Sequence, residues 1–331
     1  MAVFVSYAYH EPSTRPERVR DNVRLFLTLG TTPPHPTVTY HLTLQGSPAP
    51  PQIPSHVQVL SSENTGFDLG AHGKALASLD RSAFDFFVFL NCGARGPFLP
   101  TYWPSDRHWT TVFTDKLRAQ SHPGIVGPSL FFHAQPRDAV VETWAFALSR
   151  AALEAVLAST SVFALHATKD AAVRHGEDTL TPFLQKHGFD VDCFLLRYQH
   201  HQPWRTDLAL ATPEALNHGQ IPSRPFRYEG INVHPLELVF YKTHWRSSGA
   251  MDDGYECPFE QRYTQWLLDE SEPRTLALPR RRVHWAEPLA REEPASTASA
   301  AAPLLLPWVL MGVFAILWLV TLLLLFRAWK K

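Results

Sequence analysis

Residues 83–91 read AFDFFVFLN, and the chain continues directly into CGARGPFLP at 92–100. An apolar run without alternation is typical of a strand covered on both faces, as in a parallel sheet flanked by helices. The Gly- and Pro-containing stretch that follows predicts a loop, so the polar residues Asn91 and Arg95 come at or just past the end of a buried strand. Ligands bind outside the carboxyl ends of strands in such sheets. The stretch therefore indicates both the fold class and the place to look for chemistry.

Strands and helices alternate on both sides of this strand. Apolar and β-branched runs predict strands at 2–9, 38–44, 57–62, 124–132 and 191–196, and helical spacing predicts helices at 19–29, 67–79 and 177–188. Residues 141–159 predict a strand that gives way to a helix at Ser149, and a hairpin is expected at 231–242. We therefore expect an α/β fold with a mostly parallel sheet flanked by helices.

Composition excludes several classes of protein. The 331 residues include 30 Lys and Arg against 31 Asp and Glu, and 45% are hydrophobic. Such a chain can bury a core, and its near-neutral charge gives no reason to expect nucleic-acid binding. Its three cysteines, at 92, 193 and 257, lack the close spacing of a disulfide framework or a zinc site.

A long apolar run lies near the C-terminus. Residues 304–326 carry no charge over 23 positions, and about 20 apolar residues suffice to cross a bilayer. We expect a folded domain at 1–265, a flexible stalk at 266–303, one transmembrane helix at 304–326 and a basic tail at 327–331.

The location of the domain follows from the two ends of the chain. The first 20 residues do not resemble a signal peptide, so insertion after synthesis is expected, with the anchor in the endoplasmic reticulum or Golgi and the domain in the cytosol. The distribution of basic residues opposes this, because the tail has three cations whereas the fifteen residues before Leu304 have only Arg291. We give the missing signal more weight.

Two stretches besides 83–100 carry candidate chemistry. In SENTGFDLGAHGKAL (62–76), Asn64, Gly66 and Asp68 follow a strand, where Gly66 permits an unusual backbone angle or a ligand's close approach and the polar groups can reach a sugar or nucleotide. An ordinary turn capped by Asn64 or Asp68 explains the same pattern and is favoured by spacing alone. Glu177 and Asp178 begin a helix, where the helix dipole favours acids, but a carboxylate there could also accept a proton from a bound alcohol.

Two other residue types are less decisive. Arg95 could pair with a phosphate or, equally, bond loop carbonyls. The 17 histidines, among them His234, show no spacing typical of metal ligands.

In this order, the segments resemble inverting glycosyltransferases of the GT-A fold, similar to the large family 2 class. The family's first strand ends in a Tyr-Asn-like pair, here Ala8-Tyr9-His10, and its Asn-x-Gly-x-x-x-Ala element resembles Asn64, Gly66 and, at a shifted spacing, Ala71. More narrowly, ENTGFDLGA with FLNCGARGPFLP resembles a branch that has Glu-Asn-x-Gly-x-Asp-x-Gly-Ala and Asn-x-x-x-Arg-Gly-Pro-Phe. The resemblance covers about residues 1–200.

The resemblance implies a nucleotide-sugar donor, a glycan, lipid or protein acceptor, and a membrane-anchored enzyme. It implies that Asp178 is the base, assisted by Glu177. The implied donor-binding residues are Tyr7, Tyr9, Asn64, Gly66, Asp68, Asn91 and Arg95.

One departure concerns the metal. Where the family has Asp-x-Asp to hold Mn²⁺ or Mg²⁺, this chain has Asn91-Cys92-Gly93. Either the metal is held elsewhere, with help from Asp68 or His234, or Arg95 and other cations replace it, or catalysis has been lost; we favour reduced metal dependence. Two other functions stay open: an inactive GT-A-like binding or scaffold module on an endomembrane, and a hydrolase that uses Asp68 and Asp178 as opposed carboxylates.

Overall fold

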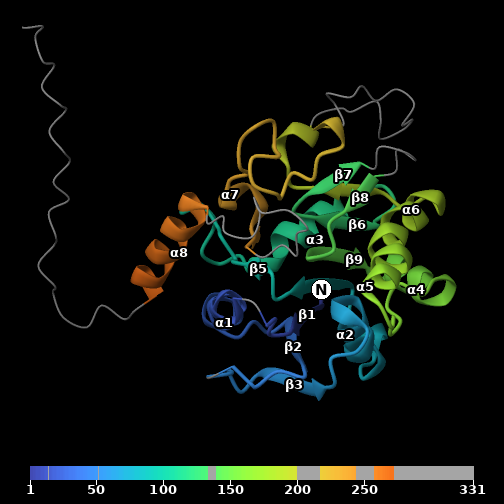
Figure 1. Ribbon diagram of the computed structural model, residues 1–331, viewed down its shortest axis with the longest axis horizontal. Coiled ribbons are helices and arrows are strands. Elements are labelled where there is room, and N and C mark those ends of the chain that lie inside the picture. The colour runs from blue at the N-terminus through green and yellow to red at the C-terminus, as the bar shows by residue number, and fades with distance from the viewer. Residues whose placement is uncertain (14, 51, 133–138, 200–216, 244–256, 272–331) are drawn as a thin grey trace, which may run out of the picture. The chain divides into compact units, whose positions relative to one another are not determined.

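The computed structural model describes residues 1–271 apart from 14, 51, 133–138, 200–216 and 244–256 (Figure 1). One compact unit runs from Met1 to Pro273. The expected transmembrane helix, the basic tail and the stalk beyond Ser271 lie outside the described residues. Among the described helices, none combines the length and apolar character that a bilayer crossing requires.

A seven-stranded sheet with strand order β10-β6-β9-β4-β1-β2-β3 forms the centre of this unit. The strands are β1 (Val3–Tyr9), β2 (Val38–Gln45), β3 (Val57–Ser62), β4 (Phe86–Asn91), β6 (Ile125–Gly127), β9 (Ala145–Ser149) and β10 (Val191–Cys193). Strands β1 to β4 are parallel, β10 is parallel to β6, and β9 runs antiparallel to both β4 and β6. The predicted mostly parallel sheet is confirmed.

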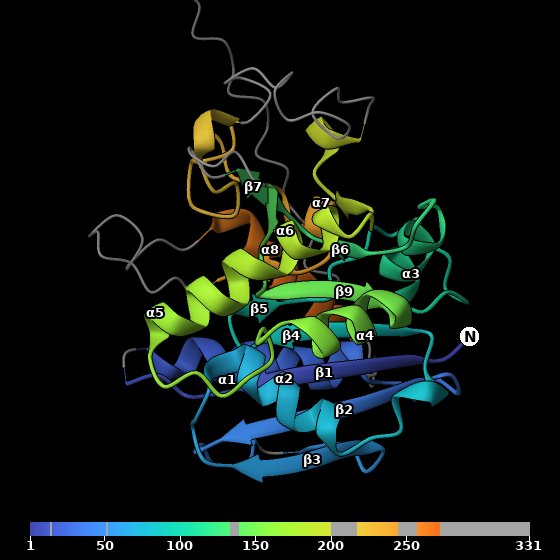
Figure 2. The same ribbon diagram turned by 90° about the vertical axis from the view of Figure 1, so that its right-hand side faces the viewer.

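Helices cover both faces of the sheet (Figures 1 and 2). Helix α1 (Pro16–Leu25) lies on the opposite face from α2 (Phe67–Ala77), α4 (Arg150–Ser159), α5 (Lys169–Ala172) and α6 (Asp178–Lys186). The remaining helices are α3 (Thr110–Arg118), α7 (Pro235–Leu238) and α8 (Pro258–Ser271).

Strand β1 shows how side chains alternate between the two faces. Tyr7 stacks on Phe26, which directly follows α1, with ring centroids 4.7 Å apart. Its neighbour Ser6 points the other way, and its hydroxyl lies 2.8 Å from Nδ1 of His72 in α2. Since every residue of β1 is buried, both faces of the strand belong to the core.

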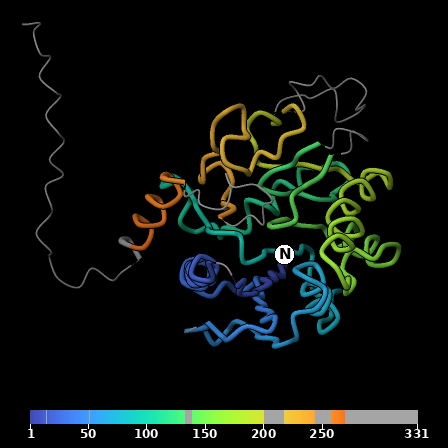
Figure 3. Tube along the Cα trace, viewed as in Figure 1, coloured from blue at the N-terminus to red at the C-terminus, as the bar shows by residue number. Residues whose placement is uncertain are grey.

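The strand order reverses between β1 and β4. The chain passes from β1 through α1 to β2 and β3, and then returns through α2 to β4 on the other side of β1. The blue N-terminal part therefore occupies one half of the sheet and the green part the other (Figure 3). Ala8 pairs with Asn91, so the carboxyl ends of β1 and β4 lie side by side. Such a reversal is where open α/β sheets bind ligands.

Two predicted elements were wrong. Residues 124–132 form two short strands, because Pro128 separates β6 from β7 (Leu130–Phe132), which pairs with β8 (Ala139–Val141) in another sheet. The expected hairpin at 231–242 contains α7, which begins at Pro235, and β11 (Tyr241–Lys242), which pairs with β5 (Ala94–Arg95).

Candidate functional site

Polar side chains tie together the ends of β1, β2 and β3. His10, just after β1, donates from Nδ1 to the carbonyl of Gln45 at the end of β2 (3.0 Å). In the neutral ring Nε2 is then an acceptor, which suits the side-chain amide of Asn64 at 3.2 Å. Gln45 in turn donates to the carbonyl of Phe67 (2.8 Å). The predicted residue Asn64 therefore lies at the carboxyl end of β1.

Asn91 and Asp68 are joined at the end of β4. The Asn91 amide donates to Oδ2 of Asp68 (2.7 Å), and its Oδ1 accepts from the backbone N–H of Gly93 (2.9 Å). The carboxylate needs a donor and the N–H needs an acceptor, so these partners fix the orientation of the amide. Oδ1 of Asp68 accepts from the N–H of Leu69 (3.1 Å). The structure thus brings the 62–76 and 87–100 stretches together at one point.

The surroundings of Asp68 keep it ionised. Burial raises the pKa of its carboxyl group, but the charge of Lys169, the hydrogen bond from Asn91 and the nearby His72 outweigh burial and hold the pKa below its ordinary value. Asp68 is therefore a carboxylate at neutral pH.

Lys169 links Asp68 to the third predicted stretch. Its ammonium lies 2.6 Å from Oε1 of Glu177 and 5.8 Å from the ring centre of Phe67, the residue before Asp68. Asp178, the next residue after Glu177, is the first residue of α6. Sequence reasoning missed Lys169, because a single lysine in the polar stretch TKDAA carries no recognisable signal.

The glycines of 66–73 allow residues 163–165, which precede Lys169 in the chain, to pack closely against α2. Gly66 has a φ of +81°, and a Cβ there would lie 2.8 Å from Cα of Leu165. A Cβ on Gly73 would lie only 2.1 Å from the carbonyl oxygen of Phe163. The unusual backbone angle expected at Gly66 is present, and the close approach is made by residues 163–165 of the chain itself. This packing brings the segment that carries Lys169 against α2.

The side chains of Tyr7 and Tyr9 pack into the core on the α1 face of the sheet and do not line the ends of the strands. Both are fully buried. The Tyr9 hydroxyl donates to Glu11 (2.6 Å), which also pairs with Arg20 (2.6 Å), while the Tyr7 hydroxyl has no partner among the described residues. In this structure the two rings support the end of β1 from the α1 face.

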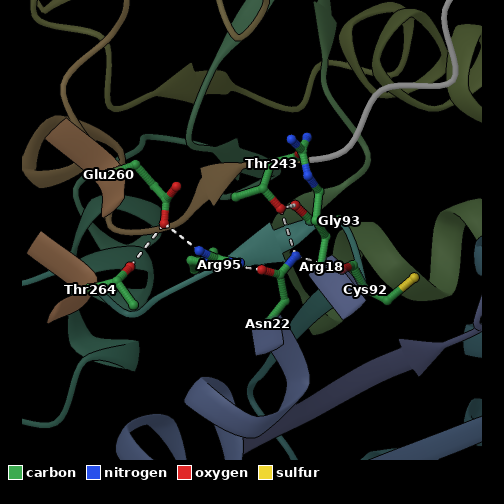
Figure 4. A network of polar contacts seen from close by, with 8 residues as sticks. All are labelled: Arg18, Asn22, Cys92, Gly93, Arg95, Thr243, Glu260 and Thr264. Carbon is green, nitrogen blue, oxygen red and sulfur yellow. Dashed lines mark hydrogen bonds and ion pairs between the residues drawn. The ribbon is translucent and has the colours of Figure 1, made fainter. Parts of the chain in front are cut away.

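Arg95 belongs to a second polar network, which meets the first at Cys92 and Gly93 (Figure 4). Its Nε donates to Oδ1 of Asn22 (2.6 Å) and its Nη1 to Glu260 of α8 (2.8 Å). Asn22 also donates to the carbonyl of Cys92 (2.8 Å) and to Thr243 (2.7 Å). An anion bound at Arg95 would have to compete with the Glu260 carboxylate.

The described residues contain no group of three or more His, Cys, Asp or Glu side chains placed to hold a metal ion. His234 instead caps α7, where Nδ1 accepts from the N–H of Leu236 (3.3 Å), and it packs edge-on against Tyr263 at 5.0 Å. Burial lowers the pKa of His234. The two predicted metal candidates thus have other contacts in the structure. His234 caps α7, and Asp68 holds the side chain of Asn91.

Comparison with known proteins gives only distant likenesses. No protein-family model and no curated protein matches the chain. Among solved structures, a protein from Desulfovibrio desulfuricans assigned as a nucleotide-diphospho-sugar transferase aligns at 10% identity and a TM-score of 0.36, over 66% of this chain and 95% of its own.

Two structures of Drosophila β1,4-galactosyltransferase 7 align at 9% and 10% identity, each with a TM-score of 0.36 over 80% of both chains. One is a mutant in complex with manganese, UDP-Gal and xylobiose, and the other is the catalytic domain with xylobiose.

Proposed function

We propose that the chain is a membrane-anchored glycosyltransferase that moves a sugar from a nucleotide-diphosphate donor to the hydroxyl group of a glycan, lipid or protein, with inversion. The observation that supports this proposal is the hydrogen bond between Asp68 and Asn91 beside the reversal of strand order, with Lys169 lying between Glu177 and Phe67. Donor binding at such a reversal follows the general rule for open α/β sheets. The motif resemblance of residues 1–200 supports the same reaction class.

The proposed transfer is an in-line displacement. The acceptor oxygen attacks the anomeric carbon, and the bond from that carbon to the diphosphate breaks with its electron pair going to the phosphate oxygen. Asp178 accepts the acceptor's proton as the new bond forms, and Glu177, held by Lys169, assists. Positioning of the two substrates and stabilisation of the leaving diphosphate supply most of the catalysis in this scheme.

Replacing Asp178 tests the proposed base. The full chain, purified in detergent, is assayed with UDP- and GDP-sugars for transfer and donor hydrolysis. Asp178→Asn should lower turnover by roughly 10²–10⁴-fold while nucleotide binding persists, because only proton transfer is lost. The exposed Asp106 provides the control, since Asp106→Asn should leave turnover unchanged. Full transfer by Asp178→Asn would remove the proposed base, and the absence of any thermal shift with nucleotides would count against donor binding.

A second function is favoured by one observation. Asn91-Cys92-Gly93 stands where the resembling family has two metal-binding carboxylates, as expected of a GT-A-like domain retained for binding rather than catalysis. Nucleotide binding without turnover on any acceptor would support this scaffold function.

The anchor is proposed from the apolar run at 304–326, with the folded domain facing the cytosol on the endoplasmic reticulum or Golgi. The full chain should remain in membranes after alkaline carbonate extraction, whereas a chain lacking 304–331 should be released. Protease added to intact microsomes should digest the domain. Protection of the domain would reverse the proposed orientation.

A further inference from the structure

The end of β4 offers fewer oxygen ligands for a divalent metal than the two carboxylates of the resembling family. Mg²⁺ requires near-ideal octahedral oxygen ligation and is usually bound through one or two carboxylates. Here the two oxygens of Asp68 accept from Leu69 and Asn91, and Oδ1 of Asn91 accepts from Gly93. The NH₂ group that Asn91 turns toward Asp68 cannot ligate a cation. The edge therefore offers one carboxylate that is already hydrogen-bonded, and we assign no step to a metal.

Lys169 supplies positive charge at this place. Its ammonium lies beside Phe67 and forms an ion pair with Glu177, and the side chain is 39% exposed to solvent. A lysine ammonium has three donors and binds phosphate as a point charge. It can therefore donate one hydrogen bond to Glu177 and another to a phosphate oxygen.

Three other cations near the site are engaged in different contacts. Lys74 donates to the hydroxyls of Ser62 and Thr65 and to the carbonyl of Glu63. Arg95 is 12% exposed and is held by Glu260 and Asn22. Arg20 pairs with Glu11 below β1. Lys169 lies beside the start of α2, because its ammonium is 5.8 Å from the ring centre of Phe67, the residue before Asp68.

We propose that Lys169 binds the diphosphate of the donor and that donor binding needs no divalent metal. As the anomeric C–O bond breaks and its electron pair moves to the phosphate oxygen, the ammonium stabilises the charge that develops there. Glu177 orients the ammonium in the absence of donor. This inference rests on the proposed glycosyltransferase function and specifies how that same site holds its substrate.

The test measures equilibrium binding of UDP and GDP, and of uridine and guanosine, to the full chain in detergent. Each titration is run once in excess EDTA and once in excess Mn²⁺. Wild-type protein should bind at least one nucleoside diphosphate in EDTA, with an affinity within about threefold of that in Mn²⁺. Lys169→Met should weaken diphosphate binding by about 10- to 100-fold and leave nucleoside binding unchanged, whereas Lys169→Arg should retain most of the affinity.

The outcomes separate the inference from the proposed function. Binding that requires Mn²⁺, or Lys169→Met protein that binds diphosphates as the wild type does, overturns the role of Lys169 while the glycosyltransferase proposal stands. Failure of wild-type protein to bind any nucleotide in either condition overturns both. Lys186→Met, on an exposed lysine of α6, controls for loss of charge. If Lys169→Met does not fold, the EDTA comparison on wild-type protein and the Lys169→Arg variant still decide.

Discussion

His72 is a buried polar residue between the site and the core. Its Nδ1 lies 2.8 Å from the Ser6 hydroxyl, and its Nε2 has no partner among the described residues. Burial lowers the pKa of the imidazole to about 4, although the charge of Asp68 acts in the opposite direction. His72 is therefore neutral at physiological pH, and its contribution to stability depends on pH.

The direction of that dependence can be predicted. An unfolded histidine takes up a proton near pH 6.5, whereas folded His72 does so only near pH 4. The unfolded state binds more protons between these values, so the stabilisation present above pH 6.5 is lost as the pH falls to about 4, by up to about 3 kcal/mol. Urea unfolding at pH 7 and pH 4.5 should show a smaller loss for His72→Gln than for wild type. The exposed His175 supplies a control variant, and an equal loss in His72→Gln would contradict the argument.

Some of the candidate site could be predicted residue by residue. The positions of Asn64, Asp68 and Asn91 follow from one rule, because polar residues after parallel strands meet at one edge. Lys169 could not be predicted, since its place depends on how residues 163–165 pack on α2. The burial of Tyr7 was not recognised, because an aromatic ring near a strand end suits both a core and a ligand surface.

At the scale of elements, the sequence predicted best where one physical signal dominated. Strand β3 matches its predicted range, and Ser149 caps α4 by accepting from the N–H of Ala152 (3.1 Å). The prediction failed at β11, which has two residues and exists because it pairs with β5. Short strands of this kind depend on distant partners, so local patterns do not reveal them.

Helix α2 offers a test of glycine packing. Gly73→Ala should lower the free energy of unfolding by about 1–3 kcal/mol, because the new methyl would meet the backbone oxygen of Phe163. It should also weaken nucleotide binding by displacing the segment that carries Lys169. Gly70→Ala is a milder perturbation of the same contact, since its Cβ would meet the Leu165 side chain at 3.1 Å and the carbonyl oxygen of Ala164 at 3.3 Å. Gly73→Ala protein as stable as the wild type would contradict the argument, because residues 163–165 would then have moved without an energetic cost.

At the scale of the whole folded unit, a buried ion pair joins α8 to β5. Glu260 and Arg95 are 5% and 12% exposed, and Thr264 also donates to the same Glu260 oxygen (2.9 Å). Helix α8 runs to Ser271, through position 265, where the sequence pattern placed the end of the domain. The last described helix is therefore part of the packed unit.

Breaking this pair should be costly. Glu260→Gln should destabilise the protein by about 3–5 kcal/mol, because the Arg95 charge would stay buried without its partner. Glu154→Gln removes a more exposed partner of Arg81 and should cost at most about 1 kcal/mol. Chemical denaturation of both variants gives the comparison. Similar costs would mean that solvent reaches Arg95 in the folded protein.

The reversed strand β9 has a consequence for how the protein folds. Strands β1 to β4 come from the first 91 residues, and β9 joins this half to β6 by pairing with β4 on one side and β6 on the other. Phe86 can pair with Ser149 only after the long segment between them has closed into a loop, which costs entropy. Contacts of such sequence separation form slowly. We therefore expect β1 to β4 to assemble before β9 docks and joins them to β6.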